Sequence, residues 1–379
     1  MTNADIAELT ALRRALHAAP ELSGQEAATA AAMRAFTADT APDQVLTGLG
    51  GHGVALVYRG AGSGPRVMIR AELDALPIEE LPGRPWRSTH PGRGHLCGHD
   101  GHAVILAGLA RLMGRGRPAR GEVVLLFQPA EEDGSGAAAV IADPCFGGIA
   151  PDWAFSLHNL PGLPEGRFVL EPGPNSCASV GLRLMLTGRT SHAAEPHKGI
   201  SPAMALARLI PGLSALGRGG DLVPDFRLVT LTHIRMGEPV FGITPGEATL
   251  CATLRTLTDD RMAALKAEAL ALAAEVAAVD GLSLAHDWHD DFAAGANDAE
   301  ATRLFRAAIA AENLPLIPGE PLRASEDFGR FKATARCAMA WVGAGEASPA
   351  LHNPDYDFPD GLIPLGVRAF HRVIRDLCG

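Results

Sequence analysis

The stretch EVVLLFQPAEE, residues 122–132, places a pair of carboxylates directly after an apolar run. The run Val123–Phe127 is short and continuously apolar, which is typical of a strand buried on both faces of a sheet. Four further runs have the same character, at Val54–Val57, Val67–Ile69, Trp153–Leu157 and Ala338–Val342. The chain is therefore predicted to contain a buried sheet.

Helical patterns lie between these runs. In His102–Met113, apolar residues such as Ile105, Leu106 and Leu109 recur at helical spacing. A further helix is predicted at Ala299–Ala311. Strands that alternate with helices predict an α/β layer fold, in which helices flank a central sheet.

The pattern changes near Cys177, where strand-like segments flank two helical ones. The predicted helices are Pro202–Leu216 and the alanine-rich segment Arg261–Ala278. Two strand pairs around two helices would form a self-contained α+β unit. We therefore predict a discontinuous catalytic domain, residues 1–176 and 291–379, with a smaller domain inserted at residues 177–290.

The composition argues against several classes of protein. With 379 residues and 47% hydrophobic content, the chain has enough material for two domains. A net charge of −10 and an isoelectric point near 5.8 argue against nucleic acid, which needs a clustered basic face. No uncharged apolar run approaches the roughly eighteen residues of a membrane span, and the N-terminus lacks a signal-peptide core. We expect a cytoplasmic protein without disulfides, because its six cysteines are sparse and scattered.

Reactive side chains follow four of the predicted strands. Open α/β sheets bind ligands beyond the carboxyl ends of their strands, so we expect these side chains to meet at one edge. They are Glu72 and Asp74 after RVMIR, Glu131 and Glu132 after EVVLLFQPA, His158 and Asn159 after WAFSL, and His352 after MAWVG.

The segment HLCGHDGH, residues 95–102, concentrates ligand-type side chains before a predicted helix that Asp100 is expected to cap. Thiolate and imidazole favour zinc, and manganese or cobalt become suitable where carboxylates join them. The other interpretation is a capped helix with incidental histidines. The ligand-type residues here are His95, Cys97, His99, Asp100 and His102.

Glu131 and Glu132 are expected to differ in role if a turn brings both into the site, one binding metal and the other moving protons. The alternative is a solvated strand end. A G-x-G-x-x-G pattern at residues 48–53 is predicted to be a hairpin turn, because a strand rather than a helix follows it. No G-x-S-x-G, Walker A or H-E-x-x-H pattern occurs.

Over nearly its whole length the sequence resembles the amidohydrolases of the aminoacylase, hippurate hydrolase and auxin-conjugate hydrolase type, a branch of the dinuclear metallopeptidases. The resemblance implies a phosphorylase/hydrolase-like sheet domain with an inserted lid or dimerisation domain. It rests on LRRALHAAPELSGQE, RAELDALPIEE, HLCGHDGHA, VVLLFQPAEEDGSGA, SLHNLPGLPEG, TSHAAEPHKGISPA, PGEATLCATLRT, SEDFGRF and LHNPDYDFP.

The resemblance implies two divalent metal ions, Mn²⁺, Zn²⁺ or Co²⁺. Their ligands would be Cys97, His99, Glu132, His158 and His352. Glu131 would then be the general base, and Asp74 a supporting residue close to the site.

Residues of the inserted domain complete the implied site. His192 would stabilise the oxyanion, in relatives often from the partner subunit, so a homodimer or higher homo-oligomer is expected through this domain. Arg255 would contact a substrate carboxylate, and Asn159 is also expected to contact substrate. Two departures bear on specificity: Gly242 stands where relatives carry an Asn, and Glu195 adds a carboxylate beside the histidine.

The expected reaction is metal-dependent hydrolysis of the amide bond of an N-acyl amino acid, or of a dipeptide-like amide, to a carboxylate and a free amino acid. The expected partner is a small-molecule substrate, with neither nucleic acid nor membrane. Two alternatives stay open. One is a cysteine amidase that uses Cys97 as nucleophile, and the other is a catalytically silent metal-binding homologue.

Overall fold

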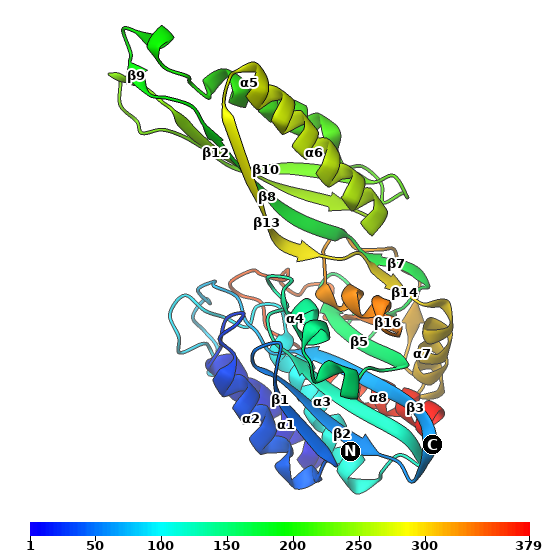
Figure 1. Ribbon diagram of the computed structural model, residues 1–379. Coiled ribbons are helices and arrows are strands. Elements are labelled where there is room, and N and C mark those ends of the chain that lie inside the picture. The colour runs from blue at the N-terminus through cyan, green and yellow to red at the C-terminus, as the bar shows by residue number, and fades with distance from the viewer. The chain divides into compact units, whose positions relative to one another are not determined.

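The five apolar runs are strands of one eight-stranded sheet in the computed structural model, which describes residues 1–379 (Figure 1). The strand order is β1-β2-β4-β3-β5-β16-β6-β15. The bounds are β1 Gln44–Leu49, β2 Gly53–Arg59, β3 Gly62–Glu72, β4 Arg120–Gln128, β5 Trp153–Leu160, β6 Phe168–Val169, β15 Leu316–Ile317 and β16 Arg336–Gly343.

Strands β4, β3, β5 and β16 are neighbours and run parallel. They are the four strands that reactive side chains follow in the sequence, so those side chains are delivered to one edge of the sheet. Strands β1 and β2 pair antiparallel, and Gly50 and Gly51 between them have φ values of 58° and 119°. The predicted hairpin turn at residues 48–53 is confirmed, because these left-handed conformations suit glycine.

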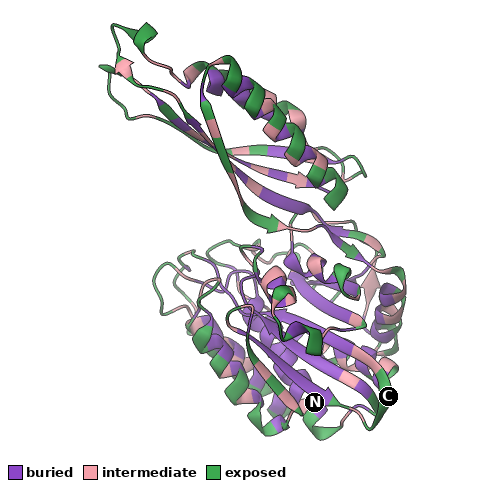
Figure 2. Ribbon diagram, viewed as in Figure 1, coloured by how far each residue is buried: buried purple, intermediate pink, exposed green.

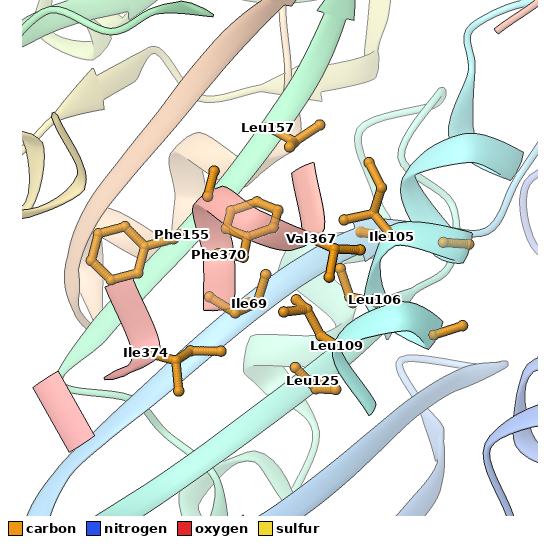
Figure 3. Packing of buried hydrophobic residues seen from close by; sticks show 14 of the residues in the cluster. Ile69, Ile105, Leu106, Leu109, Leu125, Phe155, Leu157, Val367, Phe370 and Ile374 are labelled. Atoms are coloured by element: carbon orange, nitrogen blue, oxygen red, sulfur yellow. The ribbon is translucent and has the colours of Figure 1, made fainter. Parts of the chain in front are cut away.

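Helices pack against this sheet and bury it. The longer ones are α1 Asn3–Ala18, α2 Ala27–Thr37, α3 His99–Arg115, α7 Ala299–Ala311 and α8 Leu362–Cys378, and α4 Gly136–Ala142 is shorter. The 3-10 segments are η1 Ala38–Thr40, η2 Phe146–Gly148 and η4 Asp327–Ala333. Helices α3 and α8 place Ile105, Leu109 and Phe370 against Ile69 and Leu125 of the sheet (Figure 3).

The chain divides into two structural units. Unit 1 comprises Met1–Asn175, Ala296–Glu320 and Asp327–Gly379, and unit 2 comprises Ser176–Gly295 and Pro321–Glu326. Unit 2 extends beyond residue 290 because its strand β13, Ser283–Phe292, continues through that position. The short strands β7 Gly173–Ser176 and β14 Gly295–Asn297 lie where the chain passes between the units.

Unit 2 contains a four-stranded antiparallel sheet of order β10-β12-β8-β13 and two helices. Its elements are β8 Ala178–Thr187, β9 Ser191–His192, η3 Pro196–Lys198, α5 Ala203–Leu216, β10 Arg227–Met236, β11 Ile243–Thr244, β12 Glu247–Thr256 and α6 Asp259–Val279, with β13. Alternate residues of β8, such as Leu182 and Leu184, are buried in a core shared with Leu209 and Leu265 of the helices. The remaining face is partly exposed, as Figure 2 shows. None of the helices in either unit has the length and apolar character of a membrane span.

Candidate metal centre

The start of helix α3 carries Cys97 and His99 on either side of Gly98. Gly98 has a φ of 95°, and a Cβ atom at this position would lie 2.1 Å from Oδ1 of Asn159. Both the left-handed backbone and the close approach require glycine. The tight turn lets the thiol and the imidazole enter one buried site from adjacent positions in the chain.

The His99 ring is oriented by contacts with Asp74, which lies just after strand β3. Its Nδ1 lies 2.9 Å from the carbonyl oxygen of Asp74 and is 3.4 Å from Oδ1 of the same residue. The buried Nε2 atom has no hydrogen-bond partner and lies 3.8 Å from carboxylate oxygens of both Glu131 and Glu132. A fixed Nδ1–H and a free Nε2 are the arrangement that metal-binding histidines adopt.

His158 follows the same pattern near the end of β5. Its Nδ1 lies 2.7 Å from the carbonyl oxygen of Asn159, and its Nε2 lies 3.4 Å from Sγ of Cys97. Burial first, and then the neighbouring His102, hold the pKa of His158 well below its usual range. The ring is therefore neutral, which is the form that binds a metal.

The glutamate pair lies in a turn, as predicted. Strand β4 ends at Gln128, Ala130 has a φ of 51°, and the amide of Gly134 donates to the carbonyl oxygen of Glu131 at 2.8 Å. The amide of Glu132 donates to Oδ2 of Asp74 at 2.9 Å. The main chains of the two glutamates are therefore anchored to different parts of the structure.

His352 reaches the same place from the loop after β16. It has a φ of 66°, which is uncommon outside glycine, and its amide donates to the carbonyl oxygen of Leu96 at 2.8 Å. Its Nε2 lies 3.6 Å from Oε2 of Glu132, and its side chain is half exposed. A residue from the C-terminal part of the chain thus completes the cluster.

The donor atoms form overlapping groups that fit a cation. Atoms of Cys97, His99 and His158 all lie within 4.8 Å of one another, and so do atoms of Cys97, Glu132 and His352. Thiolate, imidazole and carboxylate are a donor set suited to zinc, manganese or cobalt. The five predicted ligands are therefore brought together, and the partnerless Nε2 of His99 points to a cation among them.

The charges of the site also favour a cation. Burial opposes protonation of His99, but its hydrogen bond to Asp74 and the surrounding carboxylates outweigh burial and raise the pKa of His99 to about 10. Burial, followed by the charges of Glu132 and Glu131, raises the pKa of the Cys97 thiol well above its usual range. A metal ion would take the place of the imidazole and thiol protons.

A buried layer behind the ligands was not recognised from sequence as a unit. Glu72 contacts Nδ1 of His102 at 2.6 Å, and the other ring nitrogen contacts Oδ1 of Asn159 at 2.6 Å. The Asn159 amide nitrogen then donates to the hydroxyl of Tyr356 at 2.6 Å. Asn159 is fully buried and its side chain is bonded at both ends, and its expected contact with substrate stays a prediction. The position of Glu72 at a strand end was the available signal.

Asp100 does not cap helix α3, contrary to the prediction. The N-cap is Gly98, and the Asp100 side chain lies inside the first turn. Its Oδ2 instead contacts Nδ1 of His17 at 2.9 Å and Nη1 of Arg13 at 3.4 Å, both on helix α1. His95 is buried, and neither ring nitrogen has a hydrogen-bond partner in the structure.

The predicted residues of unit 2 lie in two places. His192 is exposed on β9, and its Nδ1 accepts from the amide of Ala194 at 3.0 Å, which leaves the proton of the neutral ring on Nε2. Arg255 is on β12 and donates to the carbonyl oxygen of Arg323 and to the hydroxyl of Ser325, both at 2.9 Å. Both acceptors are neutral, so the guanidinium charge has no counter-charge among these contacts. Burial lowers the pKa of Arg255.

The two departures from the resembled family are also placed. Gly242 offers its carbonyl oxygen to the amide of Ala193 at 3.0 Å and has no side chain with which to hold substrate. Glu195 forms an ion pair with Lys198 at 2.5 Å. The negative charge that Glu195 adds beside His192 is therefore balanced by the positive charge of Lys198.

The chain is similar to a family of hydrolases and to several of its known members. The family described as peptidase family M20/M25/M40 matches residues 68–376. N-acetyl-L-cysteine deacetylase of Bacillus subtilis is 31% identical over 357 residues, which cover 94% of this chain and 85% of that protein. Hippurate hydrolase of Campylobacter jejuni is 29% identical and is covered over 93% of its length by 94% of this chain.

A solved structure from Bacillus subtilis, described as a dinuclear metal binding peptidase of the M20 family, has the same fold. It superposes with a TM-score of 0.82 at 25% identity, over 100% of this chain and 99% of that one. The sequence comparison and the structure comparison therefore both point to the M20 family.

Proposed function

The chain belongs to peptidase family M20/M25/M40 and is a metal-dependent hydrolase, and from this premise we propose that it cleaves the amide bond of an N-acyl amino acid. The observation that carries the proposal is the convergence of the five proposed metal-binding side chains with a further carboxylate, Glu131, which lies beside His99 and Glu132. A site with ligands and a separate carboxylate suits hydrolysis rather than metal storage.

We assign the cation site to Cys97, His99, Glu132, His158 and His352 and propose that it holds two divalent ions. When bound, such ions supply an acidified water and polarise a carbonyl group. The chain would hold them on histidines whose Nδ1 atoms are already bonded to backbone carbonyl oxygens.

Glu131 would act as the general base. Its Oε2 atom faces Nε2 of His99 at 3.8 Å, and its side chain is buried. In that position it would accept a proton from the attacking water and return it to the nitrogen of the leaving amine. The products are a carboxylate and a free amino acid.

Two residues of unit 2 would serve the substrate. His192 carries its ring proton on Nε2, and this N–H can donate a hydrogen bond to the developing oxyanion. Arg255, with only neutral acceptors among its hydrogen bonds, would bind the carboxylate of the amino acid.

We expect His192→Ala to lower kcat about 10²-fold. Arg255→Ala should instead raise KM for substrates with a free carboxylate and spare their amides. Equal effects of Arg255→Ala on acids and amides would contradict its role.

The deciding experiment is a hydrolysis screen on chelator-treated protein. N-acetyl and N-benzoyl amino acids and dipeptides would be offered with added Mn²⁺, Zn²⁺ or Co²⁺, and we expect turnover only with metal. A cysteine amidase would work without metal and would be labelled covalently at Cys97. The raised pKa of that thiol opposes the thiolate such an enzyme needs. Metal-loaded protein that is inert towards the whole panel would indicate a silent homologue.

A further inference from the structure

One buried carboxylate, that of Asp327, holds both ends of the loop that carries the glutamate pair. At the beginning of the loop, Nε2 of Gln128 donates to both oxygens of Asp327, at 2.9 and 2.8 Å. At its end, the amide of Ala137 donates to Oδ2 at 2.7 Å. Residues 129–136 are therefore closed into a loop by a residue nearly 200 positions away in the chain.

Arg70 of strand β3 compensates the charge of Asp327. Both side chains are fully buried, and Nη2 of Arg70 donates to Oδ1 of Asp327. The same guanidinium also pairs with Glu72 and donates from Nε to Oε1 of Gln128 at 2.9 Å. A buried charge-assisted network of this kind is rigid, because breaking one bond leaves a charge unpaired away from water.

Asp327 also contacts the proposed general base directly. Its backbone amide lies 3.3 Å from Oε1 of Glu131, while Oε2 of Glu131 faces the ligand His99. The two oxygens of the base therefore have distinct neighbours. The carboxylate of Glu131 is oriented by the same residue that closes its loop.

We propose that Asp327 is a positioning residue that sets the orientation of Glu131 for proton transfer. The proposal rests on the proposed function, in which Glu131 is the base. It also gives a role to the SEDFGRF stretch, residues 325–331, which contains none of the proposed metal ligands and not the proposed base. Asp327 acts through Glu131 and needs no contact with substrate.

The surroundings of Asp327 require a carboxylate. The side-chain groups of Arg70 and Gln128 and the amide of Ala137 are all donors, so both oxygens must accept. In Asp327→Asn, the amide NH₂ would face a donor, and the loop would have to move. A displacement of about 1 Å near reacting groups costs on the order of 10²-fold in rate.

The test compares four proteins: wild type, Asp327→Asn, Glu131→Gln and the double variant. We expect Asp327→Asn to keep its bound metal and to lose about 10²-fold in kcat with KM nearly unchanged. The double variant should be no slower than Glu131→Gln alone, because the effect of Asp327 passes through the base.

Two results would overturn the proposal. A loss of metal in proportion to activity would show that Asp327 supports the ligands instead. A double variant slower than Glu131→Gln by the full factor of about 10² would show an action independent of the base. Wild-type protein without hydrolytic activity would refute the proposed function, whereas an active wild type with a fully active Asp327→Asn refutes only this inference.

Arg70→Lys is the second variant, in case Asp327→Asn does not fold. It keeps the positive charge but loses the fork that reaches Asp327 and Glu72 together, so kcat should fall less than in Asp327→Asn. Full activity of a folded Arg70→Lys variant would count against the proposal. Asp5→Asn is the matched control, because Asp5 is also a buried carboxylate bonded to an arginine, Arg115, but on helix α1. It should leave kcat unchanged.

Discussion

Glu131 and Glu132 are adjacent in the sequence but differ in what holds them. The amide of Glu132 is bonded to Asp74, and its side chain lies between His99 and His352. Glu131 instead receives the amide of Asp327. Two identical residues can therefore serve as ligand and base, because the turn after β4 directs them to different partners.

Substitutions at the two kinds of position should separate metal binding from proton transfer. Glu131→Gln keeps the size of the side chain and removes its basic oxygen, so we expect about 10²–10⁴-fold lower kcat with metal content unchanged. His352→Ala removes a ligand, so its affinity for metal should fall together with activity. Metal analysis beside steady-state kinetics checks both. A Glu131→Gln variant with near-normal kcat would show that another group is the base.

At the scale of elements, helix α1 is joined to the start of α3 by buried charges. His17 contacts Asp100 at 2.9 Å and Glu80 at 3.3 Å, and Arg13 contacts Asp100 and Asp357. Asp100 directly follows the ligand His99 in the chain. The docking of α1 therefore supports the helix start from which two of the ligands project.

This junction makes stability depend on pH. Burial lowers the pKa of His17, but its bonds to Asp100 and Glu80 outweigh burial and raise it from 6.5 to about 9. A raised histidine pKa stabilises the fold fully below pH 6.5, and this contribution is lost as the pH rises through about 9. The difference in unfolding free energy between wild type and His17→Gln should thus shrink by on the order of 3 kcal/mol from pH 6 to pH 9.5.

Denaturant unfolding at several pH values measures this difference. His371→Gln is the matched control, because burial lowers the pKa of His371 and the ring is already neutral above pH 7. Its difference from wild type should stay flat over the alkaline range. An equally flat difference for His17→Gln would mean that His17 is neutral in the folded protein.

At the scale of the whole molecule, each unit has its own apolar core, and the proposed metal ligands all belong to unit 1. The two cores differ: unit 1 buries a mixed sheet, whose central strands β4, β3, β5 and β16 are parallel, under helices, whereas unit 2 buries one face of an antiparallel sheet. A ligand stabilises the part that binds it by about 2.7 kcal/mol at 100 times its Kd. Bound metal should therefore stabilise unit 1 more than unit 2.

Hydrogen exchange should reveal that inequality. Adding Mn²⁺ or Zn²⁺ to chelator-treated protein should slow exchange at the ends of β3 and β5 and at the start of α3, and leave β8 and β12 of unit 2 unchanged. The His352→Ala variant, with a ligand removed, should show a smaller effect. Equal protection of both units would mean that they unfold as one cooperative body.

Much of this organisation was predictable because it depends on local pattern. The runs at Val67–Ile69 and Val123–Phe127 indicated buried strands, and the helix Ala299–Ala311 was predicted at its observed bounds. The density of ligand-type residues around Cys97 and His99 indicated a metal site before any tertiary information. Apolar periodicity and close spacing of ligands are properties of neighbouring residues, and sequence displays them directly.

Tertiary structure alone decided which distant residues meet. Strand β16 pairs with β5 although about 180 residues separate them, and that pairing brings the loop of His352 to the site. The capping role expected for Asp100 was wrong because partners on α1 engage its side chain, and Asp327 had no local signal of its contact with the glutamate loop. Long-range pairing depends on the register and burial of complete strands, which no short window of sequence contains.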